Sequence, residues 1–208
     1  MTKIKICGIT TIEDLHLAIS HGADAVGFIF VENTPRYVTI NTVKEMVREC
    51  PPFINKVGVF LNHDQSFIND AITQCNLDVL QLHGQEEPNF CNEQTQTTVK
   101  TISVKKDEDL QNIQKYKGNV SGILLDTKVD GMDGGTGQTF DWNIAIKAKN
   151  ENIPIILAGG ITADNVANAI MQVQPYAIDV CSGVESEPGK KDPFKLTQFF
   201  KNARSYDS

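Results

Sequence analysis

The chain has 208 residues, of which 40% are hydrophobic and 22% charged, and its formal net charge is -7. An acidic protein repels nucleic acid and anionic membranes, so we expect neither as a partner. The composition is that of an ordinary globular protein, and its longest apolar runs are too short to span a bilayer. A small anionic ligand remains compatible with this charge if a pocket supplies backbone N–H groups and cations.

The five cysteines, at positions 7, 50, 75, 91 and 181, are predicted to be free thiols. Their number is odd, no CxxC pair occurs and no signal peptide is recognisable, which favours a reducing cytosol. We therefore expect a cytoplasmic protein. No HxH, HExxH or DxD cluster occurs, so no metal site is predicted.

Eight short apolar runs, most of them rich in Val and Ile, predict strands. In chain order they cover residues 4–7, 25–30, 56–61, 79–83, 98–104, 122–126, 154–159 and 177–183. Several are apolar on successive residues, as expected for strands buried on both faces. Helical spacing follows each strand, at residues 12–21, 42–49, 64–75, 86–94, 107–116, 141–149, 163–171 and 192–203, and is weakest in the fourth segment. Capping residues begin several of these helices: Thr10 or Thr11, Asp64, Asp107, Asp141, Thr162 and Asp192.

The alternation of strand and helix indicates parallel strands joined by crossover helices. Eight such units in 208 residues predict an α/β protein with a single-domain (β/α)8 TIM barrel over residues 1–208. An open doubly wound sheet is the structural alternative. The loops that follow the strands of such a barrel form its active site, so the strand ends are where functional residues are sought.

Glycine-rich loops follow the last two predicted strands. Gly159 and Gly160 lie in "AGG", and Ser182 and Gly183 lie in "CSG". Loops at these positions of a barrel commonly hold phosphate, because glycine allows close approach of the backbone and successive N–H groups donate to the oxygens. A further segment, "GGTG", contains Gly135 and offers a third set of donors. The alternative is that these glycines only form tight turns.

Cys7 ends the first predicted strand and Asp126 ends the sixth. Taken singly, each has a structural explanation, since cysteine packs as a small hydrophobe and a carboxylate at a strand end caps a loop. Strands one and six lie on different sides of the barrel, so the two side chains can face one another across a ligand. That arrangement suits a reaction in which one group removes a proton and another delivers one.

Three further residues at strand ends are candidates for substrate binding, together with Gly135. Arg36 follows a proline after the second strand, and its guanidinium matches a carboxylate with two parallel hydrogen bonds; a solvated loop arginine is the alternative. His83 follows the fourth strand, where a packed histidine fits as well as a catalytic one. Asp179 orients the phosphate loop or a ligand hydroxyl, or is structural. Cys181 falls inside the eighth predicted strand and is interpreted as packing.

A set of motifs runs from Lys3 to about Lys195: "KIKICGIT", "DAVGFIF" with "PRYV", "VGVF", "LQLHG", "LLD" with "GGTG" and "FDW", "LAGGI", and "IDVCSGVE" with "PGKKD". Together these motifs resemble the phosphoribosylanthranilate isomerase family of tryptophan biosynthesis. The motifs are specific as a set, whereas "GGTG" alone would mean little. One departure is Thr34, where serine is usual before the Pro-Arg pair, and both residues keep a hydroxyl.

This resemblance implies a (β/α)8 barrel that converts an aminoaldose, N-(5-phosphoribosyl)anthranilate, to an aminoketose by an Amadori rearrangement. It implies that Cys7 is the general base at C2 of the sugar and that Asp126 is the general acid at the ring oxygen. Arg36 is implied near the anthranilate carboxylate, and the glycine loops at the phosphate. No cofactor or metal is implied. Ring opening requires a protonated Asp126, so we expect the site to raise the pKa of this carboxyl group.

Two rival functions are weighed against this one. The related aminoaldose isomerase of histidine biosynthesis uses a carboxylate after the first strand and a ligand with two phosphates, and Cys7 with one full phosphate site argues against it. A non-catalytic sensor of phosphorylated sugars would not need both Cys7 and Asp126. The outer helices show no apolar surplus, so a monomer is expected, and a dimer is left open.

Overall fold

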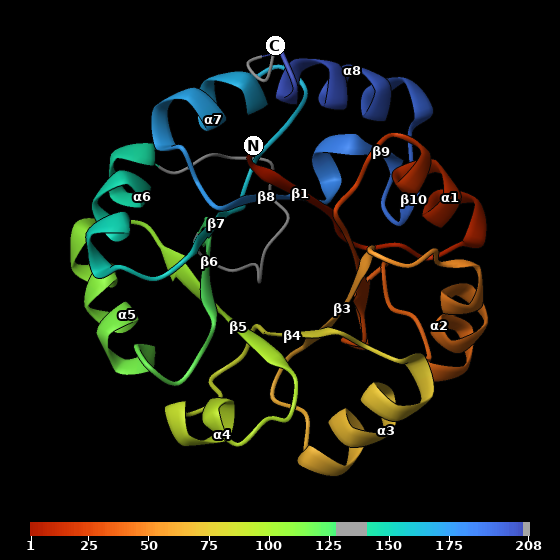
Figure 1. Ribbon diagram of the computed structural model, residues 1–208, viewed down its shortest axis with the longest axis horizontal. Helices are drawn as coiled ribbons and strands as arrows, with labels where there is room; N and C mark the ends of the chain where they lie inside the picture. The colour runs from red at the N-terminus through yellow and green to blue at the C-terminus, as the bar shows by residue number, and fades with distance from the viewer. Residues whose placement is uncertain (128–140, 206–208) are drawn as a thin grey trace.

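The computed structural model describes residues 1–127 and 141–205. Eight parallel strands form a closed barrel in sequence order, and the last strand pairs with the first (Figure 1). This confirms the predicted (β/α)8 architecture and excludes the open sheet.

The strands occupy the predicted positions, with ends that differ by one or a few residues. They are β1 (Lys3–Ile6), β2 (Ala25–Ile29), β3 (Asn55–Phe60), β4 (Val79–Leu82), β5 (Thr97–Val104), β6 (Gly122–Thr127), β7 (Ile155–Leu157) and β8 (Ala177–Val180). The helices are α1 (Ile12–Ser20), α2 (Ile40–Met46), α3 (Gln65–Cys75), α4 (Pro88–Asn92), α5 (Gln111–Tyr116), α6 (Trp142–Ala148), α7 (Val166–Val173) and α8 (Pro193–Ala203).

Four of the predicted capping residues begin their helices as expected. The side chains of Thr11, Asp64, Asp141 and Asp192 each accept a backbone N–H from the first turn, which satisfies a donor that the helix itself cannot pair. Two predicted helix starts are wrong. The segment that begins at Asp107 is a short 3-10 helix before α5, and α7 is preceded by Asn165 instead of Thr162.

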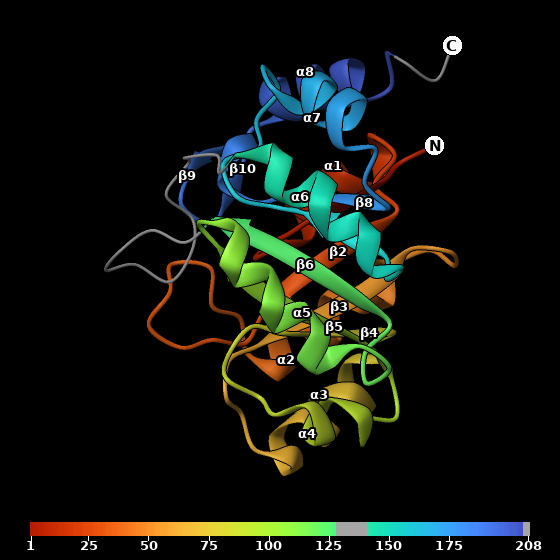
Figure 2. The same cartoon turned by 90° about the vertical axis from the view of Figure 1, so that its left-hand side faces the viewer.

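A hairpin that the sequence did not predict follows the eighth strand. It consists of a 3-10 turn, η4 (Ser182–Val184), and two short antiparallel strands, β9 (Glu185–Glu187) and β10 (Lys190–Lys191). In a side view this hairpin and the loop after β2 lie at the same end of the barrel, and the N-terminus lies at the other end (Figure 2). The hairpin therefore adds a wall to the end where the strands terminate.

Alternate residues of each strand face the helices or the barrel interior. In β1 the side chains of Ile4 and Ile6 are fully buried in the hydrophobic core, and Lys5 between them pairs with Asp179. Strand side chains that point inward therefore include charged groups as well as apolar ones. None of the helices within residues 1–127 and 141–205 has the length and apolar character needed to cross a membrane.

Candidate active site

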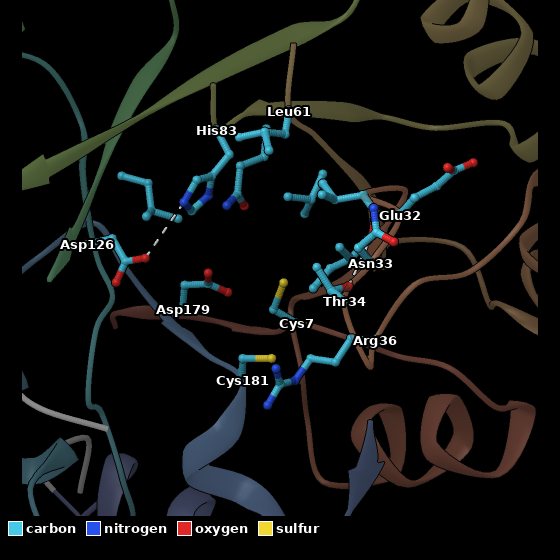
Figure 3. Close-up of a pocket in the computed structure, with 15 residues that line it drawn as sticks. Cys7, Glu32, Asn33, Thr34, Arg36, Leu61, His83, Asp126, Asp179 and Cys181 are labelled. Carbon is cyan, nitrogen blue, oxygen red and sulfur yellow. Dashed lines mark hydrogen bonds and ion pairs between the residues drawn. The ribbon is translucent and has the colours of Figure 1, made fainter. Parts of the chain in front are cut away.

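A cavity of about 470 Å³ opens at the end of the barrel where the strands terminate (Figure 3). All of the described side chains predicted to bind substrate or catalyse lie around it: Cys7, Arg36, His83, Asp126 and Asp179. They come from the ends of five different strands or the loops after them, so the barrel closure brings together residues that are far apart in the sequence. Gly135, the remaining candidate for substrate binding, lies outside the described residues.

Cys7 follows β1 directly and is held in place by the neighbouring strand. Its N–H donates to the carbonyl of Val180 at 2.9 Å, and only 5% of the residue is exposed. A hydrogen bond from the Cys181 thiol, together with the Lys5 ammonium, lowers the pKa of Cys7 to about 7, although burial and the Asp179 carboxylate oppose this shift. A large fraction of Cys7 is therefore thiolate near neutral pH.

The prediction that Cys181 lies inside the eighth strand is wrong. β8 ends at Val180, and Cys181 is a half-buried residue of the cavity wall. The hydrogen bond to Cys7 and burial raise the pKa of Cys181 well above its usual range, so Cys181 remains a thiol and acts as the donor. The predicted run, residues 177–183, continues into the turn that contains Ser182. The run therefore does not show that the strand ends at Val180.

Asp126 lies in β6 on a different side of the cavity from Cys7 (Figure 3). Its Oδ2 is 3.9 Å from Nε2 of His83, whose side chain is 22% exposed. Burial, and then the Lys100 ammonium, lower the pKa of His83, so this imidazole is neutral near pH 7. The structure thus places His83 beside the predicted acid and separates that acid from the predicted base.

Arg36 reaches the cavity from the loop after β2, and a carboxylate that the sequence analysis did not single out orients it. Its Nε and Nη2 donate to the two carboxylate oxygens of Glu185 at 2.9 and 2.6 Å. Lys191 donates to Glu185 Oε1 at 2.9 Å, and its side chain is fully buried. Burial opposes ionisation of Glu185, yet the bonds from Arg36 and Lys191 lower its pKa. Two cations therefore share one carboxylate, which leaves the region attractive to an anion.

Glu185 and Lys191 belong to the β9–β10 hairpin. Two strands of three and two residues carry no recognisable apolar period, so the spacing of apolar residues could not reveal them. Their only signal is their place in the motif pair "CSGVE" and "PGKKD".

The predicted phosphate loops come together around a smaller cavity of about 70 Å³, lined by Gly159, Gly160, Ser182 and Gly183. Gly159 and Gly160 have φ values of +78° and +66°, which favour glycine. A Cβ at Gly183 would lie 1.9 Å from the carbonyl oxygen of Ile161, so no other residue fits there. Within the described part of the chain, the N–H groups of the four lining residues donate to no protein acceptor. They are therefore available to a ligand.

The side chain of Asn165 forms two hydrogen bonds with the first of these loops. It accepts the N–H of Thr162 and donates to the carbonyl of Gly160, both at 2.9 Å. These bonds hold the loop in shape before any ligand binds, just ahead of the N-terminus of α7.

Asp179 is not free to bind a ligand alone, because it forms a buried ion pair. Its Oδ1 is 2.8 Å from Nζ of Lys5, and both side chains are 9% exposed. Lys5 could not be recognised from the sequence, because Lys3 and Lys5 alternate with isoleucine, a pattern typical of a strand with one solvated face. Residues 1–127 and 141–205 contain no cluster of three or more His, Cys, Asp or Glu that could hold a metal ion.

Comparison with known proteins identifies the family of this chain. A sequence model of the family described as N-(5'phosphoribosyl)anthranilate (PRA) isomerase matches residues 4–202. The N-(5'-phosphoribosyl)anthranilate isomerase of Geotalea uraniireducens is 47% identical over 204 residues, which cover 98% of this chain and 99% of that protein. The protein of the same name from Pelobacter propionicus is 46% identical over 204 residues, covering 98% and 96%.

Solved structures agree with the sequence matches. Phosphoribosyl anthranilate isomerase from Thermotoga maritima superposes with a TM-score of 0.92 at 38% identity, covering 98% of this chain and 99% of that one. A phosphoribosyl anthranilate isomerase in complex with reduced 1-(o-carboxyphenylamino)-1-deoxyribulose 5-phosphate superposes with a TM-score of 0.89 at 36% identity and the same coverage. Monomers generated from the dimeric Thermotoga maritima enzyme superpose with a TM-score of 0.88 at 35% identity, again with coverage of 98% and 99%.

Proposed function

Because this chain belongs to the N-(5'-phosphoribosyl)anthranilate isomerase family, we propose that it converts N-(5'-phosphoribosyl)anthranilate to 1-(2-carboxyphenylamino)-1-deoxyribulose 5-phosphate in tryptophan biosynthesis. The reaction is an intramolecular aldose–ketose isomerisation. The observation that carries the proposal for this chain is one cavity with a partly ionised thiol, Cys7, on one side and a carboxyl group, Asp126, on another. Both groups are within the walls of the same barrel, beside a glycine cradle for the phosphate.

Asp126 is proposed as the acid of the first step. It donates its proton to the furanose ring oxygen, the bond from that oxygen to C1 breaks, and the nitrogen lone pair forms a C1=N bond. His83, close to Asp126 and neutral near pH 7, adds no full positive charge that would favour the ionised carboxylate.

Cys7 is proposed as the base of the second step. Its thiolate accepts the proton from C2, the C–H electrons form C1=C2, and the electrons of the C1=N bond return to nitrogen. The enaminol then loses its hydroxyl proton and gains one at C1, which yields the C2 ketone. No electron leaves the substrate, so the proposed sequence needs no redox cofactor.

The two ends of the substrate are proposed to bind at the two sites that favour anions. The phosphate lies in the cradle formed by Gly159, Gly160, Ser182 and Gly183, where free N–H groups converge. The anthranilate carboxylate lies at Arg36, which lines the larger cavity and is oriented by Glu185. Asp179 is proposed to contact the sugar or amine between these ends, since it lines both cavities.

The function is tested by following the fluorescence of N-(5'-phosphoribosyl)anthranilate, generated in the assay, after the purified protein is added. We expect the fluorescence to decay with the wild-type protein and the decay to be strongly slowed in Cys7→Ser and Asp126→Asn, with kcat changed far more than KM. The two-phosphate aminoaldose of histidine biosynthesis serves as the comparison substrate. Binding without turnover would identify a sensor, and preference for the two-phosphate substrate would identify the other isomerase.

We propose that the protein works as a dimer, the alternative that the sequence left open. Phe53 is 98% exposed at the end of the barrel away from the active site, where it lines a second cavity of about 280 Å³ with Tyr176. Exposed aromatic groups favour contact with another protein surface, and the Thermotoga maritima relative is dimeric. The mass in solution, measured by light scattering on wild type and Phe53→Ala, tests this: a wild-type monomer would contradict it.

We place this activity in the cytoplasm, where the five free thiols remain reduced.

A further inference from the structure

Lys5 lies in the barrel interior immediately below the predicted base. Lys5 lies in β1 and Cys7 follows the last residue of that strand, where its N–H still pairs with the strand segment of Val180, so the two side chains, two residues apart, point to the same side. Lys5 is 7% exposed and is anchored by Asp179, its partner in the strand register, through a 2.8 Å contact. A buried ammonium is costly unless it interacts with negative charge, and the second group within its reach is the Cys7 thiol.

Gly27 shows that the ammonium and the thiol approach one another closely. A Cβ built on this residue would lie 2.9 Å from Sγ of Cys7 and 3.0 Å from Nζ of Lys5. Both atoms therefore lie next to the same position, which the Cβ of any residue other than glycine would occupy. The backbone at Gly27 is ordinary extended β2, with no positive φ, so the requirement for glycine there is spatial.

The titratable groups that face Cys7 come from several elements, and they do not act alike. From β8 and the turn after it come Asp179 and Cys181, from the loop after β2 comes Arg36, and from the far side of the cavity come Asp126 and His83. Arg36 and Lys191 share the Glu185 carboxylate, whereas Lys5 approaches the thiol from inside the barrel, beside Gly27. Lys5 has Asp179 as its carboxylate partner, so the thiolate of Cys7 is a second anion for the same ammonium.

We propose that Lys5 is a positioning residue of the reaction: its ammonium holds Cys7 in the thiolate form from inside the barrel, and Gly27 leaves the space for this contact. The inference rests on the proposed role of Cys7 as the base. When Cys7 accepts the substrate proton, the ammonium loses the thiolate as a partner and keeps Asp179. Lys5 lines the second cavity at the opposite end of the barrel and not the active-site cavity, so we expect it to affect the reaction through Cys7.

The test measures the ionisation of Cys7 without any substrate. Alkylation of Cys7 by iodoacetamide is followed from pH 5.5 to 10 by peptide mass spectrometry in wild type, Lys5→Met and the matched control Lys3→Met. Lys3 lies on the same strand and also pairs with an aspartate, Asp24, at 2.8 Å, but it is exposed. We expect Lys5→Met to shift the alkylation midpoint upward by about one pH unit or more, and Lys3→Met to leave it unchanged. An unshifted midpoint in folded Lys5→Met would overturn the proposal.

Lys5→Met leaves the Asp179 carboxylate buried without its partner, so a second variant removes both charges. Lys5→Met/Asp179→Asn keeps the interior neutral, and a smaller upward shift is expected in it, because the Asp179 carboxylate no longer opposes ionisation of Cys7. Loss of folding in both variants would assign Lys5 to structure alone and count against the proposal.

Kinetics separate this inference from the proposed function. At pH 7 we expect kcat of Lys5→Met to fall about tenfold, with KM little changed and much of the loss recovered above pH 9, because more Cys7 is then ionised. A shifted alkylation midpoint without a change in the pH profile of kcat would support the contact between Lys5 and Cys7 and overturn the assignment of Cys7 as the base. An unshifted midpoint in an active enzyme would leave the function standing and remove the role of Lys5.

Discussion

Arg36 and Glu185 form a two-bond ion pair at the edge of the active-site cavity, with Nε and Nη2 of the arginine 2.9 and 2.6 Å from the carboxylate oxygens. The third nitrogen, Nη1, has no partner among the described residues and is available to a ligand. A planar guanidinium fixed at two nitrogens has one orientation, so little conformational entropy is lost when a carboxylate binds.

Glu185→Gln is expected to raise KM for the anthranilate substrate by about tenfold, equivalent to about 1.4 kcal/mol of binding. A neutral amide cannot accept both arginine N–H bonds, so Arg36 loses its fixed orientation. Steady-state kinetics with fluorescence detection measure the change. Glu187→Gln is the matched control, because Glu187 lies in the same hairpin strand but is exposed and pairs with Lys190. Equal KM values in the two variants would rule out the orienting role of Glu185.

Arg36→Lys is expected to weaken binding by about tenfold or more, since an ammonium cannot reproduce the paired guanidinium bonds. The comparison uses the substrate and an analogue in which aniline replaces anthranilate. Wild type should prefer the substrate with the carboxylate, and the variant should bind both compounds with similar affinity. If the variant keeps the wild-type preference, the carboxylate does not bind at Arg36.

Gly183→Ala is expected to abolish phosphate binding and to destabilise the fold by about 1–3 kcal/mol, because the added Cβ would lie 1.9 Å from the Ile161 carbonyl. Inhibition by inorganic phosphate and denaturant unfolding measure the two effects. Gly122→Ala is the control, since its added Cβ would meet nothing nearer than 3.4 Å. Normal phosphate inhibition in Gly183→Ala would mean that the phosphate binds elsewhere.

The pH profile of kcat/KM should rise with pH through a limb with an apparent pKa of about 7, the value for Cys7 in the folded protein. The pKa of Cys7 is lower in the folded than in the unfolded chain, so the unfolded chain binds more protons between these two values. Stability contributed by Cys7 is therefore gained as pH rises from about 7 to about 9 and is lost as pH falls through about 7. Urea unfolding of wild type and Cys7→Ser at several pH values measures this difference, and parallel pH curves for the two proteins would contradict the assignment.

The barrel and most of its site could be predicted from local patterns. Runs of Val and Ile mark strands buried on both faces, and glycines after β7 and β8 mark the loops that surround the smaller cavity. The rest depends on contacts between distant segments. Lys5 looks like a surface lysine until β8 places Asp179 beside it, and the role of Glu185 appears only when the hairpin folds over Arg36.

The start of α7 is another feature that local sequence patterns did not predict. Thr162 has the side chain of a capping residue, yet its N–H donates to Asn165, which leaves α7 to begin at Val166. Thr162 and Asn165 are both polar residues that could precede the helix. Asn165 takes this position, and its side chain also donates to the carbonyl of Gly160 in the preceding loop.

The seam between β1 and β8 has a consequence for synthesis of the chain. The Lys5–Asp179 pair spans 174 positions, and Cys7 donates its backbone N–H to Val180 across the same seam. A nascent chain leaving the ribosome carries its thiol from the beginning, but that thiol gains its neighbours only after nearly all of the polypeptide has been made. The active site around Cys7 is therefore complete only after the last strand and helix have been made, so we expect a chain that stops early to have no activity.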